Sequence, residues 1–279
     1  MKLATFDAGA GPQTGVIVGD EIVATGAAGS MIDLIAGWDA LKGDIEKAAK
    51  VGERRALSGV KLLAPVLRPG KIFAIGLNYA DHIAESKVET PTQQVWFTKA
   101  VTSVNGPYDP IEIAKNGPFV DYEVELVAVI GKRGRNISKA DAASHVFGYC
   151  VGNDITERAW QHRTPQWSLG KSFDTHAPIG PWIVTSDEIG DAHDLGLRCF
   201  VNGEKRQDSN TKHLVFNIWD QIEHLSQAMT LEPGDLIFTG TPGGIGAAME
   251  PRRFLKPGDV VRCEIDKIGA IEAAMKAGS

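Results

Sequence analysis

Polar and apolar residues alternate over residues 119–131, which predicts a half-buried β-strand. On this strand Asp121, Glu123 and Glu125 share one face. Neighbouring side chains of that face lie roughly 7 Å apart, since each residue advances a strand by about 3.3 Å. Carboxylates this close repel one another unless water or a cation intervenes. Two interpretations stay open: a site for a hard cation such as Mg²⁺, or a solvated face paired with lysines of a neighbouring strand.

The rest of the pattern divides the chain in two. Residues 1–68 combine short strand-like segments with two helical patterns, and two prolines and a glycine within 65–70 indicate a boundary. We expect a small N-terminal α+β domain over 1–68 and a catalytic domain over 69–279. In the second part, short strands between Asn-Gly and Pro-Gly turns are interrupted by one amphipathic helix at 218–228. This predicts a β-rich α+β fold, a barrel or roll with few helices.

Composition narrows the function by exclusion. The net charge of −6 argues against a general affinity for nucleic acid or anionic membranes. No apolar run reaches the roughly 18–20 residues that cross a bilayer, and the N-terminus lacks the pattern of a signal peptide. Cys150, Cys199 and Cys263 are widely spaced, which favours buried thiols in a reducing compartment. We expect a cytoplasmic protein.

Two further polar groups are candidates for chemistry. Asp154 ends the apolar segment 147–154, where it either caps a helix expected over 155–161 or serves as a third metal ligand. Three carboxylate ligands would leave room on the cation for water and substrate, as in a catalytic site. His82 and Glu85 share a face if their segment is helical. The glutamate could then orient the imidazole as a base, or the two could form an ordinary surface pair.

Three more motifs each allow a functional and an ordinary interpretation. Arg158 and Gln161, one helical turn apart, either bind a planar carboxylate or are ordinary exposed helix residues. The glycine-rich loop 239–246 follows a strand, so its backbone N–H groups could receive a carboxylate. The segment 170–172 resembles the end of a phosphate-binding loop, but Pro165 stands where the first glycine of that motif must be, which excludes it.

The order of the motifs is more specific than any one of them. Along the chain they are Asn78-Tyr-x-x-His-x-x-Glu85, Asp121-Tyr-Glu-Val-Glu-Leu126, Asn153-Asp-Ile-Thr-Glu-Arg158, Gly170-Lys-Ser-Phe-Asp-Thr175, Pro178-Ile-Gly-Pro-Trp182, Val201-Asn-Gly203, Pro233-Gly-Asp235 and Thr239-Gly-Thr-Pro-Gly243. Over residues 70–270 this series resembles the fumarylacetoacetate hydrolase family, and acylpyruvate hydrolases within it. Two departures are Glu157, where a small residue is common, and Glu272, where many relatives carry asparagine.

The resemblance implies a mixed β-sandwich roll that forms a homodimer or a higher homo-oligomer. It also implies one divalent cation per site, usually Mg²⁺, with Mn²⁺ or Ca²⁺ as other possibilities. Carried over motif by motif, the metal ligands are Glu123, Glu125 and Asp154, the water-activating pair is His82 and Glu85, the catalytic lysine is Lys171, and the substrate-binding residues are Arg158, Gln161 and Thr241. Asp121 is left with a supporting or solvent-facing role.

The activity implied is hydrolysis of a carbon–carbon bond in a 2,4-dioxo acid of the acylpyruvate or fumarylpyruvate type, as in aromatic catabolism. His82 would deprotonate a water that attacks the 4-oxo carbon, and cleavage would leave a pyruvate enolate whose charge the cation offsets. An alternative uses the same cation for oxaloacetate decarboxylation or for keto–enol isomerisation of a 2-oxo acid. A non-catalytic metabolite-binding protein is the alternative of another class.

Overall fold

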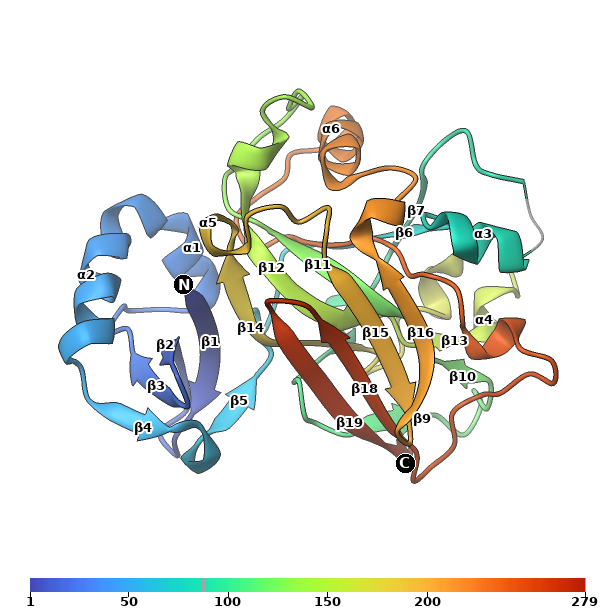
Figure 1. The fold of residues 1–279 in the computed structure, drawn as a ribbon, viewed down its shortest axis with the longest axis horizontal. Coiled ribbons are helices and arrows are strands. Elements are labelled where there is room, and N and C mark those ends of the chain that lie inside the picture. The colour runs from blue at the N-terminus through green and yellow to red at the C-terminus, as the bar shows by residue number, and fades with distance from the viewer. Residues whose placement is uncertain (87–88, 279) are drawn as a thin grey trace.

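The computed structural model describes residues 1–86 and 89–278, in which the strands form sheets of twelve, five and two strands (Figure 1). The main path of the large sheet runs β4-β3-β2-β1-β14-β12-β11-β17-β6-β7, with β5 paired to β1 and β8 to β14. Most neighbours are antiparallel, but β17 and β6 are parallel, as are β14 and β8. The predicted mixed, sheet-rich α+β fold is therefore confirmed.

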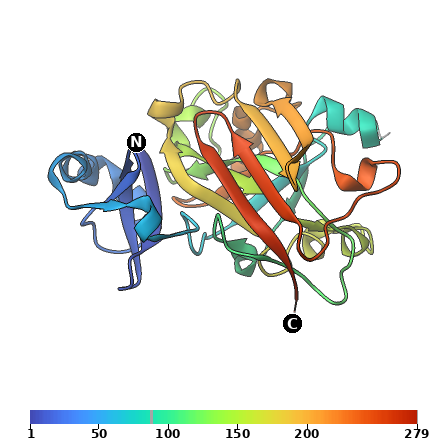
Figure 2. The same ribbon diagram turned by 60° about the horizontal axis from the view of Figure 1, so that its bottom comes forward.

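The N-terminal segment forms one end of the large sheet (blue in Figures 1 and 2). Its elements are β1 (Lys2–Asp7), β2 (Pro12–Val18), β3 (Glu21–Ala24), α1 (Met31–Ala36), α2 (Trp38–Val51), β4 (Arg54–Ala56) and β5 (Lys61–Leu63). Strand β1 continues into the rest of the sheet by pairing with β14 (Ala177–Thr185), where Leu3 lies opposite Ile183. The boundary at residue 68 stays a prediction, and hydrogen bonds of one sheet connect its two sides.

The centre of the large sheet is buried on both faces. Its remaining strands are β6 (Ile72–Gly76), β7 (Val95–Thr98), β8 (Val104–Asn105), β11 (Val124–Ile130), β12 (Val146–Asn153) and β17 (Leu236–Phe238). Every residue of β11 is buried, and the alternation divides them between two hydrophobic clusters, with Leu126 in one and Val127 in the other. Glu123 and Glu125 alternate with the even-numbered positions, so they lie on the same side as Val127 and Val129.

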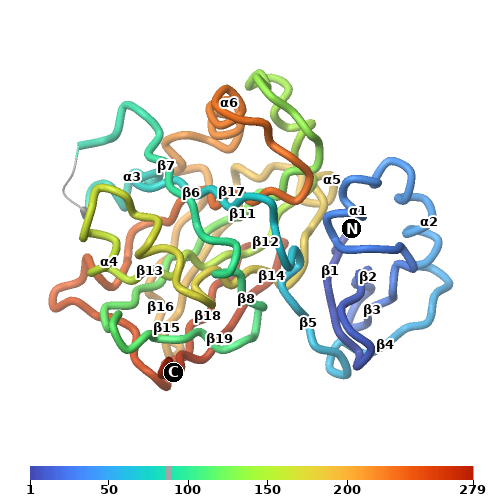
Figure 3. The backbone as a smooth tube through the Cα atoms, turned by 180° about the vertical axis from the view of Figure 1, so that it is seen from behind, coloured from blue at the N-terminus to red at the C-terminus, as the bar shows by residue number. Residues whose placement is uncertain are grey.

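A second sheet of five strands covers one face of β11 and β12, which completes the sandwich (Figures 1 and 3). Its order is β16-β15-β18-β19-β9, with bounds β9 (Ile111–Ile113), β15 (Gly196–Val201), β16 (Glu204–Asn210), β18 (Val260–Ile265) and β19 (Gly269–Ala277). The small sheet pairs β10 (Val120–Asp121) with β13 (Thr156–Glu157). The remaining helices are α3 (Ala80–Ser86), α4 (Arg158–Gln161), α5 (Ser186–Ile189) and α6 (Ile218–Ala228).

Local signals account for some elements and not for others. The helix predicted over 218–228 is α6, and its start is fixed by a capping box in which Asn217 and Asp220 exchange side-chain and backbone hydrogen bonds. The single strand predicted over 119–131 is wrong, because the chain leaves β10 after Asp121 and enters β11 only at Val124. None of the described helices is long and apolar enough to cross a membrane.

The three cysteines are buried free thiols, as predicted. Cys199 of β15 lies directly opposite Cys263 of β18, and their sulfur atoms are 3.8 Å apart. Burial raises the pKa of Cys150 to about 12, which keeps this thiol protonated and unreactive.

His176 is a core residue whose titration should make the protein less stable in acid. Its ring stacks on Phe173, its Nε2 donates to the carbonyl of Glu112, and burial lowers its pKa to about 3. Below pH 6.5 the unfolded chain therefore binds a proton that the folded chain excludes, so stability falls as the pH falls from 6.5 toward 3.

Between pH 6.5 and 5 we expect this residue to cost about 2 kcal/mol of unfolding free energy. Urea denaturation at both pH values should show a shallower pH dependence for His176→Gln than for the wild type. The exposed His213, replaced by glutamine, is the control and should keep the wild-type slope. Equal slopes for the wild type and His176→Gln would contradict this role.

Candidate active site

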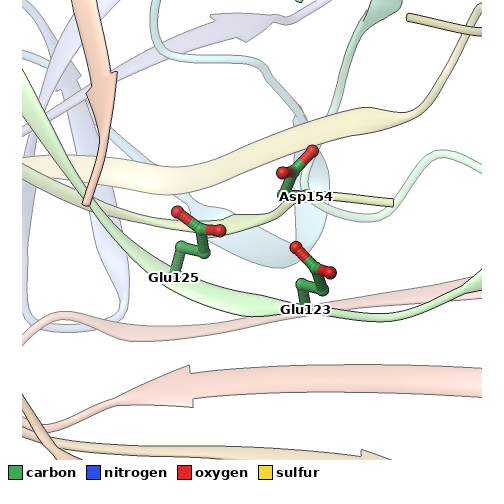
Figure 4. A group of neighbouring side chains, drawn as sticks. All are labelled: Glu123, Glu125 and Asp154. Atoms are coloured by element: carbon green, nitrogen blue, oxygen red, sulfur yellow. The ribbon is translucent and has the colours of Figure 1, made fainter. Parts of the chain in front are cut away.

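Three buried carboxylates meet where β11 begins and β12 ends. These strands are antiparallel with Val124 opposite Asn153, so Glu123 and Glu125 come close to Asp154. One carboxylate oxygen from each of the three lies within 4.8 Å of the other two, and Figure 4 shows the groups around a common space. Such a set of hard oxygen donors suits a divalent cation like Mg²⁺ or Mn²⁺.

Two buried lysines offset part of the negative charge. The Nζ of Lys171 lies 2.7 Å from Glu123 and 2.6 Å from Asp154, and the Nζ of Lys99 lies 2.5 Å from the other oxygen of Asp154. Burial alone would raise the pKa of Glu123, but the charges of Lys171 and Arg158 bring it down to about 2. Glu123 is therefore held as a carboxylate.

Glu125 is the acid of this group that lacks such a partner. Its Oε2 accepts a hydrogen bond from the backbone N–H of Gly240 at 2.7 Å, and no lysine or arginine among the described residues forms a salt bridge with it. Burial, together with the charges of Asp154 and Glu123, raises its pKa well above the ordinary value. A divalent cation would stabilise the ionised form of Glu125. The residues present therefore fit the metal that the motifs imply.

Asp154 does not cap a helix. Helix α4 is shorter than the expected 155–161, and its N-cap is Glu157, whose carboxylate accepts from the backbone N–H of Trp160 at 2.7 Å and of Phe119 at 3.0 Å. The Glu157 carboxylate is thereby engaged with backbone N–H groups, and Arg158 pairs with Asp121 and Glu123. The capping interpretation of Asp154 is wrong because the turn already has its cap.

Arg158 and Gln161 are buried and joined to each other, not exposed helix residues. Arg158 donates to Gln161 Oε1 at 3.0 Å and pairs with Glu123 at 2.7 Å and Asp121 at 2.8 Å. Asp121 is fully buried, so the solvent-facing alternative for it is wrong. It fixes the arginine beside the three carboxylates, where the guanidinium can meet an anionic ligand.

The glycine-rich loop binds carboxylates, but they belong to the protein itself. Backbone N–H groups of Gly240, Gly244 and Gly246 donate to Glu125, Glu85 and Asp121, at 2.7, 2.8 and 2.8 Å. Gly240 has a φ of +105°, and a Cβ there would lie 2.8 Å from the Cβ of Asn78, so the position requires glycine. The loop therefore positions the acids from three separate segments.

His82 and Glu85 form a pair on α3, with Nδ1 of the imidazole donating to Glu85 Oε1 at 2.9 Å. The other glutamate oxygen accepts from Gly244, which ties the pair to the glycine-rich loop. The Asn78 side chain, which precedes this helix, donates to the carbonyls of Phe216 and Thr239 and accepts from the N–H of Phe216. With Nδ1 bound to Glu85, Nε2 is the nitrogen that can accept a proton.

These groups share one cavity of about 500 Å³. All of the predicted site residues except Asp154 line it, and Asp154 lies beside its carboxylates. Thr241 is held by a hydrogen bond from Gln207 at 2.8 Å and donates to the carbonyl of Val124 at 3.0 Å. The cavity thus contains acid, base, cationic and hydroxyl groups in the space of a small metabolite.

Lys99 is a site residue that the motifs missed. It follows β7 and is buried, and besides Asp154 it donates to the backbone carbonyls of Lys171 and Ile155. In sequence it is one lysine after a short apolar strand, with no acidic partner nearby. The one local signal was its place in the largely apolar stretch 95–101, where Thr98 is the other polar residue.

Comparison with known proteins agrees with this geometry. Residues 71–276 match the family model described as "Fumarylacetoacetate (FAA) hydrolase C-terminal". The chain is 50% identical to the mitochondrial oxaloacetate tautomerase fahd2 of Xenopus laevis, over 77% of this chain and 68% of the relative.

Two solved structures resemble the whole chain. A fumarylacetoacetate hydrolase from Exiguobacterium antarcticum is 37% identical with a TM-score of 0.90, and each chain is covered completely. A maleylpyruvate hydrolase from Sphingobium sp. SYK-6, in complex with manganese(II) and pyruvate, is 36% identical with a TM-score of 0.87 over the full length of both chains. The chain belongs to the fumarylacetoacetate hydrolase family and is an enzyme of that family.

Proposed function

We propose that this enzyme hydrolyses a carbon–carbon bond in 2,4-dioxo acids of the acylpyruvate type with the help of a divalent cation. The observation that carries the proposal is the position of the His82–Glu85 pair on the same cavity as the carboxylates of Glu123 and Glu125. A base that can activate water faces a site for a charged oxo acid. The manganese and pyruvate in the related maleylpyruvate hydrolase support the same arrangement.

A cation held by Glu123, Glu125 and Asp154 would supply Lewis-acid stabilisation of negative charge on the oxo acid. Arg158, fixed by Asp121, orients the carboxylate of the 2-oxo acid, together with Gln161. These contacts place the substrate before the chemical step.

His82 then accepts a proton at Nε2 from a water that attacks the 4-oxo carbon, and Glu85 stabilises the imidazolium. The C3–C4 bond breaks, its electron pair goes to C3 of the pyruvate part, and protonation of C3 gives pyruvate and the free acid. Lys171 adds positive charge beside Glu123 as the negative charge develops.

A second candidate is keto–enol tautomerisation of oxaloacetate, favoured by the 50% identical tautomerase. That reaction moves a proton at C3 and needs no attack by water. Oxaloacetate decarboxylation would use the same carboxylate site. Hydrolysis therefore requires His82 to take a proton from water, whereas tautomerisation and decarboxylation do not.

Purified protein, assayed with a panel of acylpyruvates and oxaloacetate under Mg²⁺, Mn²⁺ and EDTA, tests the proposal. We expect turnover with either cation and a loss of at least about 100-fold after thorough chelation, because the enolate charge then lacks its main stabilisation. Activity unchanged by chelation would refute the metal-dependent mechanism. Turnover of oxaloacetate alone would favour the tautomerase or decarboxylase, and no turnover of any 2-oxo acid would favour a binding protein.

The homodimer or higher homo-oligomer and the cytoplasmic location stay predictions. Sedimentation equilibrium and cell fractionation would test them.

A further inference from the structure

The cavity has a buried floor and an exposed rim. Glu123, Glu125 and Lys171 lie at its floor and are buried, whereas His162, Glu250 and Arg252 line it and are exposed. A ligand whose 2-oxo acid end meets the carboxylate site would therefore extend its other end toward these rim residues. The rim is the part of the site that can distinguish one acyl group from another.

The cations of the floor are engaged by protein carboxylates, but Arg252 is not. Arg158 pairs with Asp121 and Glu123, and Lys171 pairs with Glu123 and Asp154. Within residues 1–86 and 89–278, no carboxylate forms a salt bridge with Arg252. It is therefore the arginine of the cavity that has its full charge to offer a ligand.

Arg253, the next residue in sequence, is an arginine with a structural role. Arg253 is not among the residues that line the cavity, and it donates to both oxygens of Glu204, at 2.8 and 3.0 Å. Arg252 and Arg253 have the same side chain and similar exposure, so they form a matched pair. Arg253 is paired with a protein carboxylate, whereas Arg252 lies between this cavity and a smaller neighbouring one and lines both.

The charge of Arg252 acts across the rim. Burial lowers the pKa of His162, and the positive charges of Arg158, Arg252 and Lys171 lower it further, so their fields overlap at this edge of the cavity. Glu250 lies on the same rim and opposes that field. Trp167 and Phe254 also line the cavity and offer apolar surface for a carbon chain.

We propose that Arg252 binds a second, distal carboxylate, so that the enzyme prefers 2-oxo dicarboxylic acids over 2-oxo monocarboxylic acids of the same length. Glu250 weakens this preference by like-charge repulsion. This inference rests on the proposed function, since that function places the 2-oxo acid end at the floor. A cavity of about 500 Å³ has room for such a molecule of six to eight carbons.

Binding of 2-oxoadipate and 2-oxohexanoate, measured by calorimetry with Mg²⁺ present, tests the proposal. Both have six carbons and neither carries the 4-oxo group, so neither is a substrate for hydrolysis. We expect the wild type to bind the dicarboxylate about twofold to fivefold more tightly, the scale of one exposed charge pair. R252Q should lose this preference, R253Q should keep it, and E250Q should increase it about twofold to threefold.

The preference should also weaken as salt is raised from 0.02 to 0.5 M, because the rim is exposed to solvent. A wild type without a preference, a loss of affinity in R252Q that is equal for the two acids, or the same loss in R253Q would overturn the assignment. The outcome is separate from that of the turnover assay. Selective binding through Arg252 without turnover would refute the proposed function alone, and turnover without selectivity would refute this inference alone.

Discussion

Replacement of His82 by alanine should slow hydrolysis of an acylpyruvate by about 10²–10⁴-fold in kcat, the usual contribution of a general base. The imidazole has its orientation fixed on one side, because Nδ1 donates to Glu85 and Glu85 is itself bound by Gly244. Its other nitrogen is then available to a water in the cavity. Since KM reflects contacts to the 2-oxo acid end, it should change little.

Glu85→Gln is the matched variant for this pair. The amide has one acceptor oxygen, so it can serve His82 only by turning its NH2 toward the donating N–H of Gly244, and it has no charge to stabilise the imidazolium. Because the imidazole itself remains, we expect a smaller loss, of about tenfold to 100-fold. The double variant should be little worse than His82→Ala, because the two residues act as a unit. Stopped-flow measurement of acylpyruvate loss would give these rates. Hydrolysis at the wild-type rate in His82→Ala would exclude the water-activation step, and a selective loss that spares oxaloacetate tautomerisation would separate the two candidate reactions.

Much of the site could be predicted because its groups are close in sequence. Glu123 and Glu125 are two residues apart, and His82 and Glu85 are separated by one helical turn, so a local pattern brings each pair together. The order of the motifs then connected the pairs to Asp154 and Lys171 through the family resemblance. The structure places all of these residues at one cavity, while their individual roles stay predictions.

The features that the sequence did not predict depend on contacts between distant segments, which a local pattern does not contain. Strict alternation predicted one strand through Tyr122, but β10 pairs with the distant β13 and ends at Asp121, before β11 begins at Val124. The residues alone left Asp154 as either a helix cap or a metal ligand, and in the structure Glu157 is the cap. Arg252 lies in irregular backbone, where neither periodicity nor a turn motif indicates which way a side chain points.

Lys99 is another residue whose role depends on contacts between distant segments. Strand β7 pairs with β6 in the large sheet, several strands away from β12. The strand order therefore does not predict that a residue following β7 contacts Asp154. The contact arises because the chain leaves the sheet after Thr98 and turns Lys99 toward the end of β12. Only the folded chain shows that a lysine following the edge strand β7 pairs with a carboxylate at the centre of the sheet.

Lys99→Met should lower the free energy of unfolding by roughly 3 kcal/mol, the cost of breaking a buried ion pair by removing one partner. The methionine keeps the length of the side chain but leaves Asp154, which is fully buried, with Lys171 as its remaining cationic partner. Lys61→Met is the surface control, since Lys61 pairs with Asp109 at 2.7 Å but is well exposed, and it should cost less than about 1 kcal/mol. Urea denaturation with and without Mg²⁺ measures both. The cation should stabilise Lys99→Met more than the wild type, because it restores positive charge beside Asp154. A loss as small as that of Lys61→Met, or equal stabilisation of both proteins by Mg²⁺, would show that Lys99 fills space without balancing the charge of the carboxylates.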